Sequence, residues 1–287
     1  MEIKDKAGYN EKMRLGIIDK AWFISEYAGW NNIRTIVDFG CADGALIQVL
    51  KICMPEKEFI GVDNSDFMRD VFSKNTGCRV FESLDDLLNN YPLELDKTAL
   101  ILGSVIHEVY SYSPEEEEIA RFWDNVKKFK VVAIREMLLP SDGVVCASEW
   151  VRKNVRNNWD REYEKQLVDH ERIWGRIDAP IGTAIGPNGT KYDVTDEMDT
   201  QEMEFIPALK SFMKLMLSFT YTKNWERELL EDYLPLSKED YEQIADDMGM
   251  KIKFEWVGSY GYFKAIYPGL KYWDEVPDTH IRLLLER

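Results

Sequence analysis

The sequence has few of the residues that build metal centres and disulfide frameworks. Only four cysteines and three histidines occur among its 287 residues. The cysteines are scattered, with no pair at metal-binding spacing, and we interpret them as reduced packing residues. No two histidines have metal-binding spacing either, so no metal site is predicted, although carboxylates can hold a magnesium ion. The residues concerned are Cys41, Cys53, Cys78, Cys146, His107, His170 and His280.

Long apolar runs are also absent. None reaches the roughly 18 residues that a membrane-spanning helix requires. The amino-terminal residues are charged and lack the short apolar block of a secretion signal. We therefore expect a cytoplasmic protein without a membrane partner. The hydrophobic share of 45% can supply a full core, and the chain is longer than one compact doubly wound unit needs.

The chain lacks a net positive charge. Its formal charge of -16 repels polyphosphate and disfavours indiscriminate binding to nucleic acid. The stretch 152–176 stands out, because basic and aromatic residues alternate there in a way that suits phosphate contacts and base stacking. Acidic residues in the same stretch favour an alternative, a solvated amphipathic helix with near-neighbour ion pairs. The basic and aromatic residues are Arg152, Lys153, Arg156, Arg161, Lys165, Arg172, Arg176, Trp159, Tyr163 and Trp174, and the acidic ones are Asp160, Glu162, Glu164, Asp169 and Glu171.

Short apolar runs alternate with helical patterns through the first half of the chain. The alternation predicts a parallel sheet with helices on both faces. Strands are expected at 33–37, 58–62, 78–81, 99–103 and 131–134, and helices at 45–53, 67–74, 84–90 and 113–130.

A glycine-bearing turn follows the first of these strands. Asp38 ends the apolar run, and Gly40 and Gly44 lie between it and the next helix. Glycine lets the main chain approach a ligand closely, and the start of a helix presents unpaired N–H donors. Asp63 ends the second strand, about 20 residues after the turn, where an acid can accept hydrogen bonds from a ribose. The pattern is typical of a nucleotide-type cofactor pocket.

These two segments resemble the first and second motifs of the class I S-adenosylmethionine-dependent methyltransferases. The resemblance rests on 37–44 and 61–65 and covers roughly 30–140. It implies a Rossmann-like fold whose last strand inserts antiparallel, and a cofactor site in which Asp38 orients the methionine amino group and Asp63 binds the ribose. Ala42 departs from the family, which often has glycine there, and its methyl group should narrow the turn. The residues expected at the cofactor are Asp38, Gly40, Cys41, Ala42, Gly44, Asp63, Asn64, Glu82, Ser83 and Ser104.

A dinucleotide-binding unit is the main alternative for this turn. Its fingerprint places a third glycine one position later, where this chain has Ala45. No run resembles the phosphate loop that ends in Gly-Lys-Ser or Gly-Lys-Thr, so a nucleoside triphosphate is disfavoured. A third possibility is an α/β domain whose glycine turn binds nothing.

Residues directly after the strands are expected to line the pocket, since ligands bind outside the carboxyl ends of such strands. The resemblance places the loop at Glu82 and Ser83 against the adenine. The polar segment 104–112 would face the methyl acceptor. His107 is the first candidate for a general base and Glu108 the second, because an oxygen or a protonated nitrogen must lose a proton. Tyr110, Tyr112 and Arg135 are the candidate substrate-binding residues.

The strand-helix rhythm breaks at 144–235 and resumes with strands expected at 251–257 and 279–285. We expect a Rossmann-like domain of 1–143 and 236–287, with an amphipathic helix at 9–30 that can close over the cofactor. The mainly helical insertion at 144–235 would cap the pocket and hold the acceptor. The expected fold is thus a doubly wound, mostly parallel seven-stranded sheet with an antiparallel last strand.

The sequence therefore predicts a methyltransferase that moves a methyl group by in-line displacement from S-adenosylmethionine to an oxygen or nitrogen, releasing S-adenosylhomocysteine. A small metabolite is the expected acceptor. An RNA acceptor held by 152–176 is an alternative, and a cofactor-binding protein without catalysis is another. The oligomeric state stays open.

Overall fold

The computed structural model describes residues 16–113, 115–139, 169, 172, 183–185, 191–193, 224–258 and 278–287. The chain divides into two compact units. One comprises Asp5–Met137, Glu239–Trp256 and Ile281–Arg287, and the other comprises Met1–Lys4, Leu138–Lys238 and Val257–His280.

A seven-stranded sheet in the order β3-β2-β1-β4-β5-β9-β8 forms the centre of the first unit. Neighbouring strands from β3 to β5 are parallel. β8 and β9 complete the sheet, and β9, the last strand of the chain, lies between β5 and β8. The bounds are β1 Thr35–Phe39, β2 Glu58–Val62, β3 Arg79–Phe81, β4 Thr98–Gly103, β5 Val131–Met137, β8 Lys251–Gly258 and β9 His280–Glu286.

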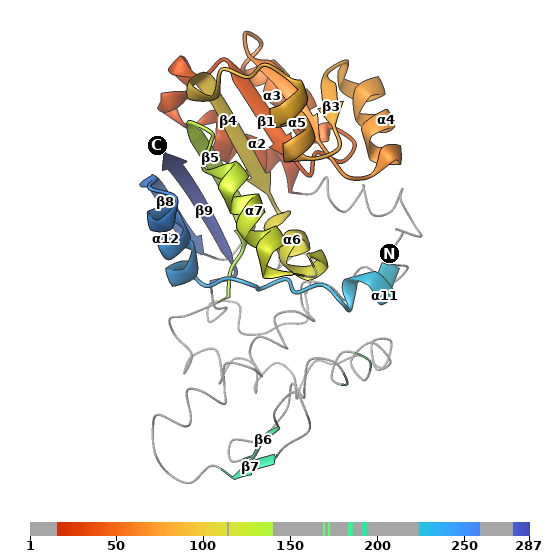
Figure 1. Ribbon diagram of the computed structural model, residues 1–287, viewed down its shortest axis with the longest axis vertical. Helices are drawn as coiled ribbons and strands as arrows, with labels where there is room; N and C mark the ends of the chain where they lie inside the picture. The colour runs from red at the N-terminus through yellow and green to blue at the C-terminus, as the bar shows by residue number, and fades with distance from the viewer. Residues whose placement is uncertain are drawn as a thin grey trace. The chain divides into compact units, whose positions relative to one another are not determined.

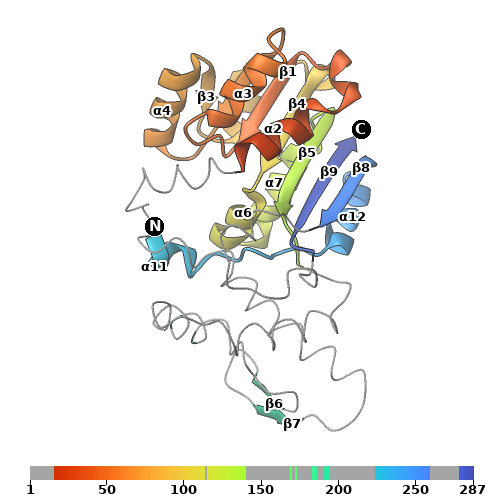
Figure 2. The same cartoon turned by 180° about the vertical axis from the view of Figure 1, so that it is seen from behind.

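The last strand runs against its neighbours, as predicted. The N–H of Arg287, just after β9, donates to the carbonyl of Lys130, just before β5, at 3.0 Å. At the other end, the N–H of Leu138 donates to the carbonyl of Thr279 at 2.9 Å. Figure 2 shows β9 pointing opposite to β5 and β8. The predicted fold class, a mostly parallel seven-stranded sheet with an antiparallel last strand, is confirmed.

Helices cover both faces of this sheet (Figures 1 and 2). The short α6 lies beyond the carboxyl end of β4, in the segment expected to be a loop (Figure 1). The helix predicted to have Ser113 as its cap and Pro114 in its first turn begins instead at Glu116. On one face lie α2 Ile17–Ser25, α3 Ala45–Cys53 and α4 Asp66–Thr76, and on the other lie α5 Leu84–Asn90, α7 Glu116–Val126 and α12 Lys238–Asp247, while α6 spans Ile106–Tyr112 and the 3-10 turns η1 and η2 span Ala28–Asn32 and Leu95–Lys97.

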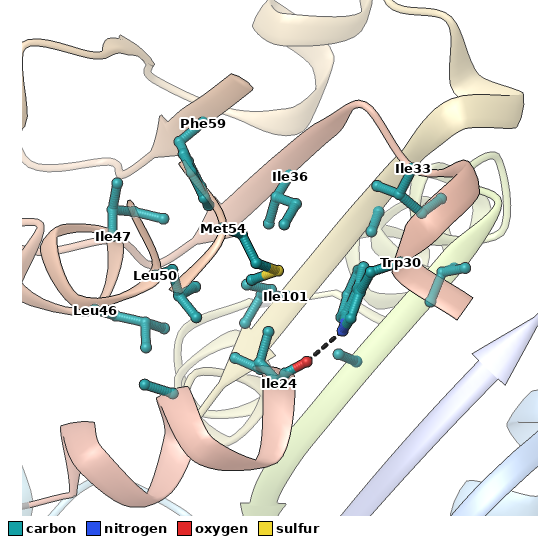
Figure 3. Packing of buried hydrophobic residues seen from close by; sticks show 14 of the residues in the cluster. Ile24, Trp30, Ile33, Ile36, Leu46, Ile47, Leu50, Met54, Phe59 and Ile101 are labelled. Carbon is teal, nitrogen blue, oxygen red and sulfur yellow. Dashed lines mark hydrogen bonds between the residues drawn. The ribbon is translucent and has the colours of Figure 1, made fainter. Parts of the chain in front are cut away.

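Apolar side chains from α2, α3, β1 and β4 pack together between these two helices and the face of the sheet that they cover (Figure 3). Ile47 and Leu50 of α3 and Ile36 of β1 are fully buried there. The indole N–H of Trp30 donates to the carbonyl of Ile24, so that this large ring is buried without an unsatisfied donor (Figure 3). The packing holds α2 against the sheet close to the predicted cofactor turn.

Two strand bounds differ from the predictions in a way that matters for the site. β1 extends to Phe39, so Asp38 lies within the strand. β5 extends to Met137, so Arg135 and Glu136 lie inside the strand and are buried, not on the rim after it. A charged residue after an apolar run usually predicts the end of a strand. Here Arg135 and Glu136 both have polar partners, which make their burial within the strand tolerable.

Few residues of the predicted insertion are described. β6 Thr183–Ile185 and β7 Lys191–Asp193 form a two-stranded antiparallel sheet, and α11 spans Trp225–Glu228. From the basic stretch, the structure describes only Asp169 and Arg172, which form an ion pair at 3.8 Å. The other helices predicted there lie outside the described residues, and the domain division at 144 and 235 stays a prediction. None of the helices that are described has the length and apolar character needed to cross a bilayer.

Candidate cofactor and acceptor site

The turn after β1 has a backbone that suits glycine. Gly40 and Gly44 have φ angles of 73° and 80°, in the left-handed region. A Cβ at Gly40 would lie 2.6 Å from Cγ2 of Val105, and one at Gly44 would lie 2.4 Å from Cγ2 of Thr76. Neither position has room for a side chain.

Ala42 has a φ of 44°, which is also left-handed. A residue with a Cβ is disfavoured in this region by about 1–2 kcal/mol, so the methyl group of Ala42 makes the backbone of the turn less favourable than glycine would. Strained residues of this kind cluster at functional sites. Ser104, after β4, is the other described non-glycine residue with a positive φ, at 59°.

Asp63 ties the turn to the next helix. Its Oδ2 accepts the N–H of Ala42 at 3.0 Å, and its Oδ1 accepts the N–H of Ser65 at 2.9 Å. Burial raises the pKa of Asp63, against the effect of these two N–H donors, and the charge of Glu108 raises it further. A carboxylate oxygen has more than one acceptor position, so both oxygens can still receive a hydroxyl. The acid predicted to bind ribose is thus held in a fixed orientation.

Asp38 is a buried carboxylate at the same edge of the sheet. The residue is 3% exposed, and none of the described residues donates a hydrogen bond to it. Burial raises its pKa to about 7; the charge of Lys20 opposes this shift and that of Asp63 adds to it. A buried carboxylate is costly unless a cation or an N–H donor reaches it, and the described part of the chain supplies no hydrogen bond to the Asp38 carboxylate.

Lys20 and Asp19 of α2 belong to this region but were not among the predicted residues. Nζ of Lys20 donates to the carbonyl of Gly103 at 2.8 Å. Asp19 lies 3.6 Å from Nε of Arg135 and forms an ion pair with Arg282 of β9. Arg135 in turn donates from Nη1 to Oγ of Ser104 at 2.7 Å. No local pattern marks such partners, since more than 80 positions separate Lys20 from Gly103.

His107 and Glu136 form the second part of the site. Oε1 of Glu136 lies 3.0 Å from Nδ1 of His107, and both side chains are buried. Oε2 of the same carboxylate accepts the N–H groups of Val105 and Ile106, at 2.7 and 2.6 Å. Val105 lies against Gly40, so the start of α6 is next to the glycine turn.

Glu136 acts as an anion in this arrangement. Burial alone would raise its pKa, but the His107 imidazole and the backbone N–H donors around it lower the pKa overall. An ionised carboxylate accepts hydrogen bonds only, so we assign the proton to Nδ1 of His107. The other ring nitrogen, Nε2, is then the one that can accept a proton. Glu136 is not among the residues predicted at the site.

The remaining predicted residues have varied positions. Tyr110 accepts the indole N–H of Trp123 at 3.1 Å, and burial raises the pKa of its phenol. Tyr112, at the end of α6, is 41% exposed. Ser83 caps α5 by accepting the N–H of Asp86, and Glu82 and Asn64 are exposed. Their roles towards adenine and acceptor stay predictions.

Cys41 is buried in the turn. A Cβ at Gly61 would lie 2.7 Å from Sγ of Cys41, so the two residues are in close contact. Burial raises the pKa of the thiol. The interpretation of Cys41 as a packing residue therefore fits its surroundings. Its side chain fills the space between the turn and β2.

The strand order, with the antiparallel last strand beside β5, matches the class I methyltransferase fold. Among solved structures, the chain is similar to an O-methyltransferase family protein from Burkholderia thailandensis, with a TM-score of 0.52 and 14% identity over 98% of this chain and 59% of that one. The chain thus spans about 59% of the length of that protein. The predicted fold of the resembling family is confirmed.

Two further solved structures have TM-scores below one half. The plantazolicin methyltransferase BpumL, solved in complex with S-adenosylhomocysteine, has a TM-score of 0.46 and 11% identity over 99% of this chain and 90% of that one. The mitomycin 7-O-methyltransferase MmcR has a TM-score of 0.44 and 9% identity over 95% of this chain and 54% of that one. No protein-family model and no curated protein matches the chain by sequence.

Proposed function

We propose that this protein is an S-adenosylmethionine-dependent methyltransferase that methylates an oxygen, or a nitrogen that must first lose a proton, on a small molecule. The observation that carries the proposal is the buried His107–Glu136 pair beside the glycine turn. A histidine whose ring is oriented by a carboxylate can act as a general base, which such an acceptor calls for.

The residues at the carboxyl edge fit the proposed cofactor. Asp38 is a buried carboxylate with no donor among the described residues, as a site for an ammonium group requires. Asp63 retains acceptor positions for ribose hydroxyls. The left-handed backbone at Gly40 and Gly44, which favours glycine, allows a close approach of the main chain to an adenosyl group. When bound, the cofactor supplies an electrophilic methyl group on a sulfonium sulfur.

His107 is suited to accept the acceptor's proton at Nε2. Glu136 fixes the tautomer and orientation of the ring, and its negative charge stabilises the imidazolium that forms. In the proposed reaction the new bond joins the methyl carbon to the acceptor atom, the sulfur–methyl bond breaks, and the acceptor's proton passes to His107. General bases of this kind contribute about 10²–10⁴-fold in rate.

A small acceptor agrees with the charge of the chain. At -16, the average field repels an RNA backbone. The single described pair from the basic stretch, Asp169 with Arg172, is a near-neighbour ion pair of the kind found on a solvated helix. Neither observation supports an RNA acceptor.

Incubation of the full chain with a cell extract and isotopically methyl-labelled S-adenosylmethionine tests the proposal. Mass spectrometry of the small-molecule and RNA fractions should find label in a small molecule, with much less when His107→Gln replaces the wild type. Label only in RNA would overturn the choice of acceptor. Equal label with His107→Gln would remove His107 as the base.

A further inference from the structure

β8 is an edge strand of the seven-stranded sheet. It stands last in the strand order, and among the described strands only β9 pairs with it (Figure 2). Its first five residues are exposed. A long, exposed edge strand presents a row of N–H and C=O groups to which another strand can be added. The edge strand at the opposite end of the sheet, β3, has only three residues.

The direction of the backbone groups along β8 follows from a hydrogen bond at its end. The carbonyl of Gly258 accepts the N–H of Thr279, directly before β9, at 3.2 Å, so Gly258 turns its backbone polar groups towards β9. Successive residues of a strand turn these groups in opposite directions. Counted back along β8, Lys253 and Glu255 therefore turn theirs to the outer edge.

The two sides of β8 differ in chemistry. The ring centroid of Phe254 lies 5.8 Å from that of Phe23 in α2, so Phe254 is on the side of the sheet that α2 covers. The helix α12 covers the other side (Figures 1 and 2). Because side chains alternate along a strand, the α2 side carries Ile252, Phe254 and Trp256, and the α12 side carries Lys251, Lys253 and Glu255.

Apolar side chains on the α2 side are exposed at this edge. Phe254 is 41% exposed and Ile252 is 36% exposed. Trp22 of α2, 57% exposed, is close to them, since Cζ of Arg282 lies 6.0 Å from its ring centroid and 4.5 Å from that of Trp256. Neighbouring exposed apolar side chains with charged residues around them are typical of a protein interaction surface.

We propose that two copies of this chain pair through their β8 strands, antiparallel and about a two-fold axis, so that one sheet continues across the dimer. The register is the one in which Phe254 lies opposite the partner's Phe254. Lys253 then lies opposite the partner's Glu255, where both strands turn their backbone groups outward. The symmetry repeats this contact, because Glu255 lies opposite the partner's Lys253. Opposite charges in directly opposed positions stabilise a strand pair.

Charge and backbone direction select this register. A shift of the partner strand by two residues in one direction puts Lys253 opposite the partner's Lys253, and a shift in the other direction puts Glu255 opposite the partner's Glu255. Like charges in directly opposed positions are destabilising. A shift by one residue fails to match the outward-turned backbone groups of the two strands.

The charge around β8 differs from the charge of the whole chain. A net charge of -16 opposes association at long range, but at about 0.15 M salt charges more than about 8 Å apart are largely screened. Lys251 and Lys253 outnumber Glu255 in the exposed part of β8. On the same side, α12 has five exposed acids, so the basic strand of one copy meets acidic surroundings in the other. These acids are Glu239, Asp240, Glu242, Asp246 and Asp247.

Sedimentation velocity of the full chain over a range of concentrations, in about 0.15 M salt, tests the dimer. The wild type should sediment as a dimer. Lys253→Glu and Glu255→Lys should each raise its dissociation constant at least about 10-fold, because each turns two attractive pairs into two repulsive ones. An equimolar mixture of the two variants should form a dimer again, since both pairs in the mixed dimer join opposite charges.

Lys74→Glu is the matched control. Lys74 is exposed on α4, which packs against β3 at the opposite edge of the sheet, and its replacement changes the net charge as Lys253→Glu does. The dissociation constant should stay that of the wild type. The double variant Lys253→Glu with Glu255→Lys exchanges the two charges within one chain and should dimerise as the wild type does. Far-UV circular dichroism reports whether each variant is folded.

A wild type that stays monomeric at every concentration would overturn the proposal, and the lysines of β8 would then keep the edge unpaired. A dimer that both single variants leave unchanged, or that their mixture fails to restore, would show that another surface or register forms it. The dimer does not depend on the proposed function, so none of these outcomes bears on methyl transfer.

Discussion

Glu136 in β5 accepts the Nδ1 hydrogen of His107 at 3.0 Å across 29 positions of sequence. Its second oxygen receives the first N–H groups of α6, those of Val105 and Ile106. One carboxylate therefore both starts the helix and orients the candidate base. Structure and catalysis should fail together when this group is changed.

Replacement of Glu136 by Gln should lower turnover by two or more orders of magnitude, because a neutral amide cannot stabilise an imidazolium as a carboxylate does. It should also lower the free energy of unfolding by about 1–3 kcal/mol. The amide NH2 cannot accept a hydrogen bond, so at least one backbone N–H that the carboxylate now accepts would lose its acceptor. Urea denaturation and initial rates measure the two effects. The exposed Glu118→Gln in α7 serves as the control, and a Glu136→Gln variant with wild-type turnover would contradict the orienting role.

Replacement of His107 by Gln should lower turnover by about 10²–10⁴-fold while leaving the affinity for S-adenosylhomocysteine within a small factor. Glu108→Gln is the informative comparison, because Glu108 is the second candidate base and its charge acts on Asp63. Rates and calorimetric affinities should be measured for both variants. A larger loss of turnover in Glu108→Gln would transfer the role of base to Glu108.

Replacement of Ala42 by Gly should stabilise the protein by on the order of 1 kcal/mol, because the left-handed φ of 44° disfavours a Cβ. Ala45→Gly, three positions later at the start of α3, should instead destabilise by about 0.5–1 kcal/mol. Chemical denaturation of the two variants gives the comparison. Destabilisation in both would mean that the turn does not hold Ala42 in the left-handed region.

Asp38 should make the ligand-free protein less stable as the pH rises. Its folded pKa of about 7 lies above the ordinary value of 3.8. The stability it contributes is full below the ordinary value and is lost as the pH rises through 7. Asp38→Asn removes this loss. The difference in free energy of unfolding between the variant and the wild type should therefore favour the variant more at pH 7.5 than at pH 5, by on the order of 2 kcal/mol.

Lys20 and Asp63, the charged groups that act on Asp38, are present in both proteins, so the comparison isolates the one carboxyl group. Denaturation at the two pH values supplies the measurement. A gain that is equal at both values would show that Asp38 is ionised and solvated throughout.

Elements with clear ends could be predicted from the sequence. β2 and α5 have the expected bounds, since turn residues and a Ser83 cap mark their limits. The turn after β1 was predictable because its acid and glycines are adjacent in sequence. These features depend on local chemistry alone.

Features that depend on distant partners could not be predicted. α6 has no side-chain cap of its own, because Glu136 from another strand receives its first N–H groups, so the segment looked like a loop. Lys20 resembles any lysine of an amphipathic helix until α2 packs on the sheet. Arg135 looked like a rim residue, since the partners that make its burial tolerable, among them Ser104 and Asp19, are distant in the sequence.

Calorimetric titration of the wild type with S-adenosylhomocysteine and, separately, with NAD+ tests the central claim most directly. The fold is shared by proteins that bind different nucleotides, so the ligand decides between them. The account predicts one S-adenosylhomocysteine bound per chain and no measurable heat with NAD+. Binding of NAD+ without binding of S-adenosylhomocysteine would contradict it.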